Sequence, residues 1–333
     1  MSPRRLIVPA ALFSASALVL AGCASTDAAG TEDGRIAVVA STNVYGQIVE
    51  EIGGDLVDVT SIVAAGSQDP HSFEPSARDQ LSVSRADLIV ENGGGYDSFI
   101  DSLIDATGTE AHVITAVEFS HDWPENDGHA EETEEHAEDE AEGEHTEDEH
   151  DHEDHGHVEG FNEHVWYDPH TIVHVAEAIA EELAEISPDD SAAFDANFET
   201  FAAGIEDLEA SLTEIDTAHG GDEIFVTEPV PLYLTGAAGL VNVAPEAFTE
   251  AVEEGQDVAP ATLLEALDLI SAGTVNAVIA NAQTGGAETS AIIDEAETQE
   301  IPVVEFTETL PDDQTYLSWM QSNIEALETA LAE

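Results

Sequence analysis

The sequence predicts an α/β protein with two lobes, and three observations support this fold class. Its 333 residues fit about two domains at roughly 150 residues each. In both halves, short apolar runs with strand character alternate with helical patterns, which is typical of domains built on mostly parallel sheets. Between the halves, one apolar stripe continues at helical spacing for about 28 residues, which predicts a single helix roughly 40 Å long.

Residues 1–23 predict a lipoprotein signal peptide. Arg4 and Arg5 precede an apolar run, Leu6–Leu20, that is short for a membrane span and fits a secretory signal. The run ends in Leu20-Ala21-Gly22-Cys23, which resembles a bacterial lipobox, and Cys23 is the only cysteine. We expect an acylated Cys23 that anchors an extracytoplasmic protein to the lipid bilayer, rather than a free cysteine in an ordinary signal peptide. Residues 24–35 predict a flexible tether.

The first lobe is expected at residues 36–187. Helical patterns at 44–52 and 96–106 lie between its strands, so the strands are expected to be parallel. The strand patterns lie at 36–40, 57–63, 88–90 and 112–117.

Within this lobe, the composition changes abruptly at residues 121–160. The segment has 19 Asp or Glu and 8 His, and one Val is its only aliphatic residue larger than Ala. Such a segment buries too little apolar surface to offset its chain entropy, so it predicts a disordered loop. A loop of this length inside a domain is uncommon and usually functional.

Two helices are expected after Gly160. Asp168-Pro169 predicts the start of a helix that continues to about Ile186. Ser187-Pro188 predicts the N-cap and first turn of the next helix, which we place at 188–218 as the link between the lobes. This helix either runs along both lobes or covers one of them as an amphipathic surface helix. Its apolar stripe consists of Phe194, Phe198, Phe201, Ile205, Leu208, Leu212 and Ile215.

The second lobe, expected at residues 219–333, repeats the alternation of strands and helices. Asn276 and the polar run 281–286 border one of its strands, and we interpret them as a turn before the next helix rather than as part of a cleft. Strand patterns lie at 223–227, 241–243, 275–281 and 302–306, and helical patterns at 261–271, 286–298 and 314–332.

The charge excludes several classes of function. The chain has 73 Asp or Glu, five Arg and no Lys, so its formal net charge is −68. Nucleic acid and anionic lipid headgroups are therefore excluded as ligands, and cations are favoured. One cysteine excludes an intramolecular disulfide and a cysteine-based zinc site. Outside residues 121–160 there remain 54 acids, which indicates either a saline or alkaline setting or a negative field that concentrates cations.

Two segments carry candidate metal-binding histidines. Asp69-Pro70-His71-Ser72-Phe73-Glu74-Pro75-Ser76 follows a strand, and its two prolines stiffen the loop around His71. Loops at the carboxyl edge of an α/β sheet are common ligand sites. Phe161-Asn162-Glu163-His164-Val165-Trp166-Tyr167-Asp168-Pro169 carries His164 beside two aromatic residues that can exclude water. Taken singly, each histidine is more simply a structural or surface residue.

Enzyme chemistry is not expected. His170 and His174 have the i, i+4 spacing of a metal chelate, but there is no HExxH motif and no third ligand nearby, so we interpret them as surface residues. The chain also lacks a GxSxG motif and a catalytic Cys–His pair, because its single cysteine is the expected lipidation site.

Taken together, these features resemble the zinc/manganese solute-binding receptors of ABC importers, the helical-backbone metal receptor family known as cluster A-I. The resemblance covers nearly all of residues 36–333. It rests on the lipobox, the DPHSFEPS and HVWYDP segments, the His-rich acidic loop between them, and the long central helix. It implies two α/β lobes joined by one long rigid helix, with one metal ion in the cleft between the lobes.

The resemblance also implies four metal ligands, of which His71 and His164 are two. A third ligand follows the first strand of the second lobe, where zinc-type members tend to have His and manganese-type members Glu; this chain has Glu228. The fourth, usually Asp, follows the last strand, and the matching residue here is Glu308, which is longer by one methylene.

The expected cargo is Zn²⁺, with Mn²⁺ as the alternative. Two imidazoles and two carboxylates carry a charge of −2, and four protein ligands leave little room for an activated water, so the site is expected to bind and release an ion. Glu228 favours manganese, whereas the acidic loop favours zinc because imidazole is a common zinc ligand. The loop histidines expected to capture zinc weakly are His129, His136, His145, His150, His152, His155 and His157.

The resemblance implies a monomeric zinc receptor that delivers its ion to a membrane permease powered by an ATPase. A manganese receptor of the same family is one alternative. A surface adhesin or metal buffer without a transporter is an alternative from another class of protein.

Overall fold

The computed structural model describes residues 34–64, 70–126, 158 and 160–332. The first lobe is built on a four-stranded parallel sheet in the order β2-β1-β3-β4. Its strands are β1 (Ile36–Thr42), β2 (Val57–Val63), β3 (Leu88–Glu91) and β4 (His112–Thr115). Its helices are α1 (Asn43–Gly53), α2 (Ala77–Val83), α3 (Phe99–Thr107) and α4 (Pro169–Ile186).

The second lobe has a sheet of the same strand order, β6-β5-β7-β8, again parallel throughout. Its strands are β5 (Glu223–Val226), β6 (Val241–Asn242), β7 (Ala277–Asn281) and β8 (Val303–Phe306). Its helices are α6 (Leu232–Ala237), α7 (Glu246–Glu253), α8 (Pro260–Ser271), α9 (Ala287–Thr298) and α10 (Tyr316–Leu331). The predicted fold class of two α/β lobes is therefore confirmed.

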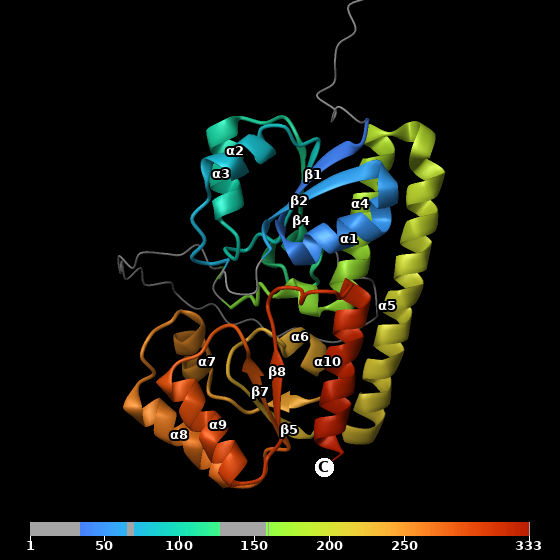
Figure 1. The fold of residues 1–333 in the computed structure, drawn as a ribbon. Helices are drawn as coiled ribbons and strands as arrows, with labels where there is room; N and C mark the ends of the chain where they lie inside the picture. Colours follow the sequence, from blue (N-terminus) through green and yellow to red (C-terminus); the bar gives the residue numbers. More distant parts are fainter. Residues whose placement is uncertain (1–33, 65–69, 127–157, 159, 333) are drawn as a thin grey trace, which may run out of the picture.

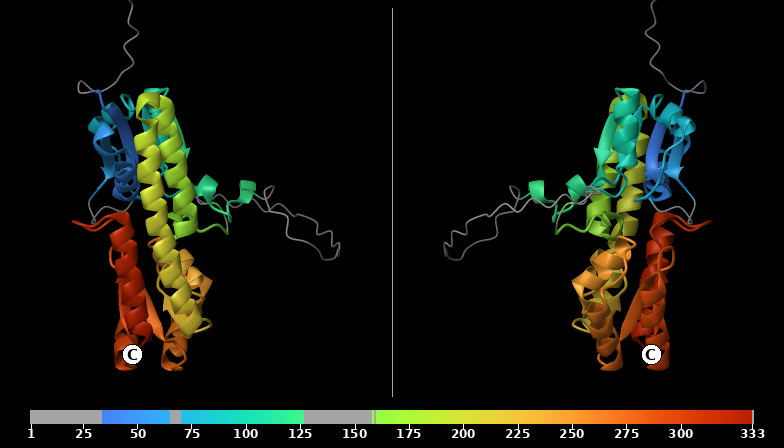
Figure 2. Two further views of the ribbon diagram at one scale, coloured as in Figure 1. Left: turned by 90° about the vertical axis from the view of Figure 1, so that its right-hand side faces the viewer. Right: turned by 90° about the vertical axis from the view of Figure 1, so that its left-hand side faces the viewer.

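The helix α5 (Ser191–His219) runs along both lobes (Figure 1). It has 29 residues, which corresponds to about 43 Å. It packs against α1 and α4 in the first lobe and against α6 and α10 in the second. The predicted stripe faces these helices, since all of its residues are buried except Phe198, which is half-buried. The side views in Figure 2 show α5 continuing past the junction of the lobes.

One apolar core passes through both lobes along α5. It includes Ile48 of α1, Trp166, Leu208 of α5 and Leu327 of α10, all buried. Two smaller clusters lie apart from it, one around Ile89 and α3, the other around α8 and α9. Because the main core is continuous, burial of apolar surface fixes the lobes relative to each other as well as within themselves.

Hydrogen bonds also cross between the lobes near the carboxyl ends of the strands. Tyr167 donates through Oη to the carbonyl of Thr307 at 2.7 Å, and Tyr316 donates through Oη to the carbonyl of Trp166 at 2.8 Å. Asn43, directly after β1, exchanges two hydrogen bonds with the backbone of Leu310. These bonds set the spacing of the cleft in which the candidate ligands lie.

Three sequence predictions need correction. The strand predicted at 112–117 ends at Thr115, because a 3₁₀ turn begins at Ala116, in which Ser120 donates its backbone N–H to the carbonyl of Val117 at 3.0 Å. The long helix begins at Ser191, after a 3₁₀ turn at Pro188–Asp190. Disorder from residue 121 onward is wrong for residues 121–126, where Trp123 packs edge-on against Phe161 with ring centroids 5.1 Å apart.

Several predictions fall outside the described residues. These concern Cys23, the signal peptide, the tether as far as residue 33, and the seven loop histidines from His129 to His157. Within the described part of the chain, no helix combines the length and apolar character needed to cross a membrane.

Candidate metal centre

The loop that carries His71 is fixed by local packing. Pro70 and Pro75 flank it, and the carbonyl of Pro70 accepts the backbone N–H of Phe73 at 3.3 Å. The ring of Phe73 lies 4.9 Å from that of Phe99 in the α3 helix. Ser76 then begins α2 with a capping box, which satisfies the free N–H groups of the first turn. His71 is thus held beside the cleft by an anchored loop, half-buried.

Tyr96 reaches His71 through a glycine turn after β3. Three consecutive glycines, 93–95, have positive φ angles of 79°, 67° and 98°, which side-chain-bearing residues rarely adopt. The turn directs the ring of Tyr96 edge-on to the ring of His71, with centroids 4.8 Å apart. The Tyr96 hydroxyl donates to Oε2 of Glu308 at 3.4 Å, which joins the lobes at this point.

His164 is oriented by Asn162. The Oδ1 atom of Asn162 lies 2.7 Å from Nδ1 of His164, and its Nδ2 atom donates to the carbonyl of Pro229 at 3.2 Å. Since the amide oxygen can only accept, Nδ1 carries the proton and Nε2 has the lone pair available for a metal. The side chain of His164 is only 1% exposed, and the ring of Trp166 packs against it at 5.1 Å.

Glu228 and Glu308 are held together by Asn281, at the end of β7. The Nδ2 atom of Asn281 donates to Oε2 of Glu228 at 2.7 Å and to Oε1 of Glu308 at 2.6 Å. The hydroxyl of Thr284 donates to the other oxygen of Glu228. Both carboxylates are buried, with 2% and 4% of the residue exposed. Adjacent buried carboxylates repel each other, and here one shared amide donor offsets part of that repulsion.

Three of the four candidate ligands meet in the cleft between the lobes, and the fourth, Glu228, lies beside one of them. Ligand atoms of His71, His164 and Glu308 lie within 4.8 Å of one another, and Asn281 places Glu228 directly beside Glu308. We call His71, His164, Glu228 and Glu308 the inner group. Glu228 follows β5 and Asn281 ends β7, so the carboxylates lie where neighbouring parallel strands end and the strand order reverses.

Further acids face the inner group. The Oε1 atom of Glu253, the last residue of α7, lies 3.6 Å from Nε2 of His164. Burial, together with the nearby carboxylates of Glu163, Glu228 and Glu308, raises the pKa of the Glu253 carboxyl to about 9. Such a concentration of buried carboxyl groups is stable when a cation neutralises it.

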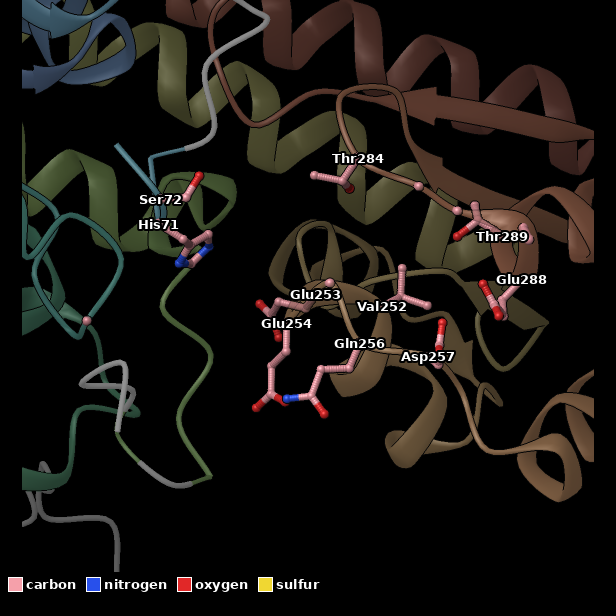
Figure 3. Close-up of a pocket in the computed structure, with 15 residues that line it drawn as sticks. His71, Ser72, Val252, Glu253, Glu254, Gln256, Asp257, Thr284, Glu288 and Thr289 are labelled. Atoms are coloured by element: carbon pink, nitrogen blue, oxygen red, sulfur yellow. The ribbon is translucent and has the colours of Figure 1, made fainter. Parts of the chain in front are cut away.

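A pocket of about 490 Å³ opens beside the inner group. His71 lines it from the first lobe, and Val252–Asp257 and Thr284–Thr289 line it from the second (Figure 3). The described residues that line this pocket include no arginine. They include four acids, Glu253, Glu254, Asp257 and Glu288. The pocket therefore favours positively charged ligands.

Sequence reasoning missed several residues of this centre. The run from Asn281 was interpreted as a turn, but Asn281 and Thr284 hold the carboxylates. Tyr96, Glu163 and Glu253 had no sequence signal, because only the fold brings them beside the histidines. In contrast, His170 and His174 are exposed on α4 and do not join the centre, as the surface interpretation predicted.

A comparison with protein families establishes the family of the chain. A family model described as ZnuA, the periplasmic component A of a zinc-uptake complex, matches residues 38–330. The chain belongs to this family. ZnuA-family proteins are metal-binding receptors rather than enzymes, so the predicted absence of an enzyme activity and the stated resemblance are both confirmed.

Curated relatives include proteins named for both metals. The chain is 28% identical over 194 residues to the manganese-binding lipoprotein MntA of Halalkalibacterium halodurans, covering 58% of this chain and 54% of MntA. It is 24% identical over 234 residues to the zinc-binding lipoprotein AdcA of Streptococcus pneumoniae, covering 70% of this chain and 42% of AdcA. The chain thus spans about half the length of these relatives.

Several solved structures share the fold. The periplasmic zinc-binding protein TroA of Treponema pallidum superposes with a TM-score of 0.68 at 17% identity, over 90% of this chain and 100% of TroA. A crystal structure of ZnuA superposes with a TM-score of 0.63 at 22% identity, over 90% of this chain and 97% of the ZnuA chain. A mutant structure of the laminin-binding adhesin Lmb of Streptococcus agalactiae superposes with a TM-score of 0.66 at 21% identity, over 89% of this chain and 99% of the Lmb chain.

Proposed function

We propose that this protein is an extracytoplasmic receptor that binds Zn²⁺ through His71, His164, Glu228 and Glu308 and delivers it to an ABC import permease. The observation that carries the proposal is the convergence of ligand atoms from residues 71, 164 and 308, far apart in sequence, within 4.8 Å of one another. Family membership supports it, because the matching model describes a component of zinc uptake.

The chemistry of the inner group suits transport. Two imidazoles and two carboxylates provide four ligands for Zn²⁺ and a charge of −2 that balances it. A sphere filled by protein ligands leaves no open position for an activated water, so the ion is bound without hydrolytic chemistry. Because the ligands come from both lobes, separating the lobes would dismantle the sphere and release the ion.

The proposed organisation follows the relatives named lipoproteins. Residues 1–23 form the signal peptide, acylated Cys23 anchors the protein, and residues 24–35 tether it. The two lobes, linked by α5, act as a monomer on a permease and its ATPase. The loop histidines of 121–160 capture zinc weakly and pass it to the cleft.

Manganese is the second candidate cargo, and Glu228 is the observation that favours it. A carboxylate at this position makes the donor set His₂Glu₂, which is harder than a three-histidine set and better suited to manganese. Of the two relatives, MntA is named for manganese binding and AdcA for zinc binding. Zinc is preferred here because the Irving–Williams order makes it bind more tightly than manganese to the same nitrogen and oxygen donors.

Growth under metal limitation tests the proposal. Deletion of the gene should slow growth in zinc-depleted medium, and the wild-type gene should restore it, whereas a variant with His71→Ala and His164→Ala should not. Rescue by added manganese instead of zinc would move the cargo to manganese. Normal growth of the deletion strain in both media, with loss of surface adhesion, would favour the adhesin alternative.

A further inference from the structure

A second set of ligand atoms lies beside the inner group. Ligand atoms of His71, Glu163 and Glu253 lie within 4.8 Å of one another. Glu163 precedes His164 in the first lobe, whereas Glu253 ends α7 in the second, so this set also bridges the lobes. Only His71 belongs to both sets.

The second set lies on the route by which a cation can reach the inner group. His164, Glu228 and Glu308 are at most 4% exposed, and none of them lines the 490 Å³ pocket. His71 and Glu253 do line it, from opposite sides, as Figure 3 shows. A cation that enters through this pocket therefore meets His71 and Glu253 before it reaches the buried ligands.

The two sets are close enough for a cation to pass from one to the other. Oε1 of Glu253 lies 3.6 Å from Nε2 of His164. Two ligand atoms bound to one zinc ion at about 2.0–2.1 Å are roughly 3.4 Å apart at the tetrahedral angle. The ion can thus exchange Glu253 for His164 while His71 keeps its bond.

We propose that His71, Glu163 and Glu253 form an outer position for divalent cations, which the ion occupies before it moves to the inner group. The proposal rests on the proposed function, since the inner group is the destination. One imidazole and two carboxylates leave coordination positions for water, so the outer position binds more weakly and exchanges faster than the inner group.

Metal-binding kinetics of Glu253→Gln test the outer position. Stopped-flow tryptophan fluorescence of the metal-free protein measures the rates, because the ring of Trp166 lies 5.1 Å from that of His164. The matched control is Glu254→Gln, which makes the same substitution at the next residue of the pocket lining, an exposed one. Thermal unfolding checks that both variants fold.

Glu253→Gln should slow zinc association at least about tenfold, because an amide is a poorer metal ligand than a carboxylate and the entering ion loses a ligand of the outer position. Dissociation should slow by the same factor, because the dissociation constant should change less than about threefold, under 1 kcal/mol. Glu254→Gln should keep both rates within about twofold of the wild type. Glu163→Gln should slow zinc association in the same way. This second variant tests the outer position even if Glu253→Gln fails to fold.

Association of both variants, Glu253→Gln and Glu163→Gln, at the wild-type rate would overturn the outer position. Weaker equilibrium binding with unchanged association would also overturn it, because Glu253 would then act as an inner ligand. In either case, tight binding by the wild type leaves the proposed function standing. Absence of tight zinc or manganese binding by the wild type would overturn both proposals.

Discussion

Asn281 offers a direct perturbation of the inner group that leaves every proposed ligand in place. One amide nitrogen donates to Glu228 at 2.7 Å and to Glu308 at 2.6 Å. Asn281→Ala removes this donor, so two buried carboxylates remain side by side without the group that holds them. We expect them to move apart in the metal-free protein and to be less well placed for a cation.

The expected loss follows from how such supporting residues act in metal sites. Removing a hydrogen-bond partner of a metal ligand typically lowers metal affinity by about 10–100-fold, or roughly 1.4–2.7 kcal/mol. Asn281 supports two ligands at once, so we expect the upper part of this range for zinc. The loss should appear in the dissociation constant, because the pocket residues His71 and Glu253 are unchanged.

Competition with a fluorescent zinc chelator measures the effect. The matched control is Asn276→Ala, an exposed residue just before the same strand whose amide donates to the carbonyls of Glu223 and Thr274. The control should bind zinc as the wild type does. A folded Asn281→Ala variant with affinity within about twofold of the wild type would refute the account of how the carboxylates are held.

Four further predictions concern the ligands, the loop and the core. His71→Ala should lower zinc affinity at least about 100-fold without changing thermal unfolding of the metal-free protein, and unchanged affinity in a titration would contradict its role as a ligand. Glu228→His should raise the zinc-to-manganese affinity ratio at least about tenfold in paired titrations, because imidazole is the softer donor; an unchanged ratio would count against Glu228. Deletion of residues 125–157 should remove weak zinc equivalents and keep one tight site by mass spectrometry, whereas loss of the tight site would make the loop a primary ligand source. Burial, with the nearby Asp97 and Asp101, raises the pKa of Glu91 to about 8, so folded-state stability falls as pH rises from 4.5 toward 8. At about 1.4 kcal/mol per pKa unit, Glu91→Gln should be about 2–4 kcal/mol more stable than the wild type at pH 8 and similar near pH 5 by urea unfolding; a pH-independent difference would contradict the shift.

The strands were predictable because their apolar runs are short, buried and bounded by polar residues. Each of the eight predicted strands corresponds to an observed one, with ends displaced by at most two residues. The helices α2, α6 and α7 were missed, since 6 to 8 residues contain too few turns to show an apolar period. The stripe on α5 was visible because it continues through many turns.

The site was predictable only in part. His71 and His164 stand in distinctive segments, so the sequence itself pointed to them. Glu228 and Glu308 are two among 73 acids and were identified through the family resemblance alone. Asn281 acts through contacts within the second lobe, and Glu163 and Glu253 act through proximity between the lobes. No local pattern encodes a contact between residues so far apart in the chain.

The central claim is that the cleft holds one tightly bound divalent ion on His71, His164, Glu228 and Glu308. A competition titration of the metal-free protein with zinc and manganese, with stoichiometry from mass spectrometry, tests it most directly. We predict one tight zinc ion, several weak ones, and weaker manganese binding. Manganese binding as tight as zinc would assign the cargo to manganese, and the absence of a tight site for either ion would contradict the account.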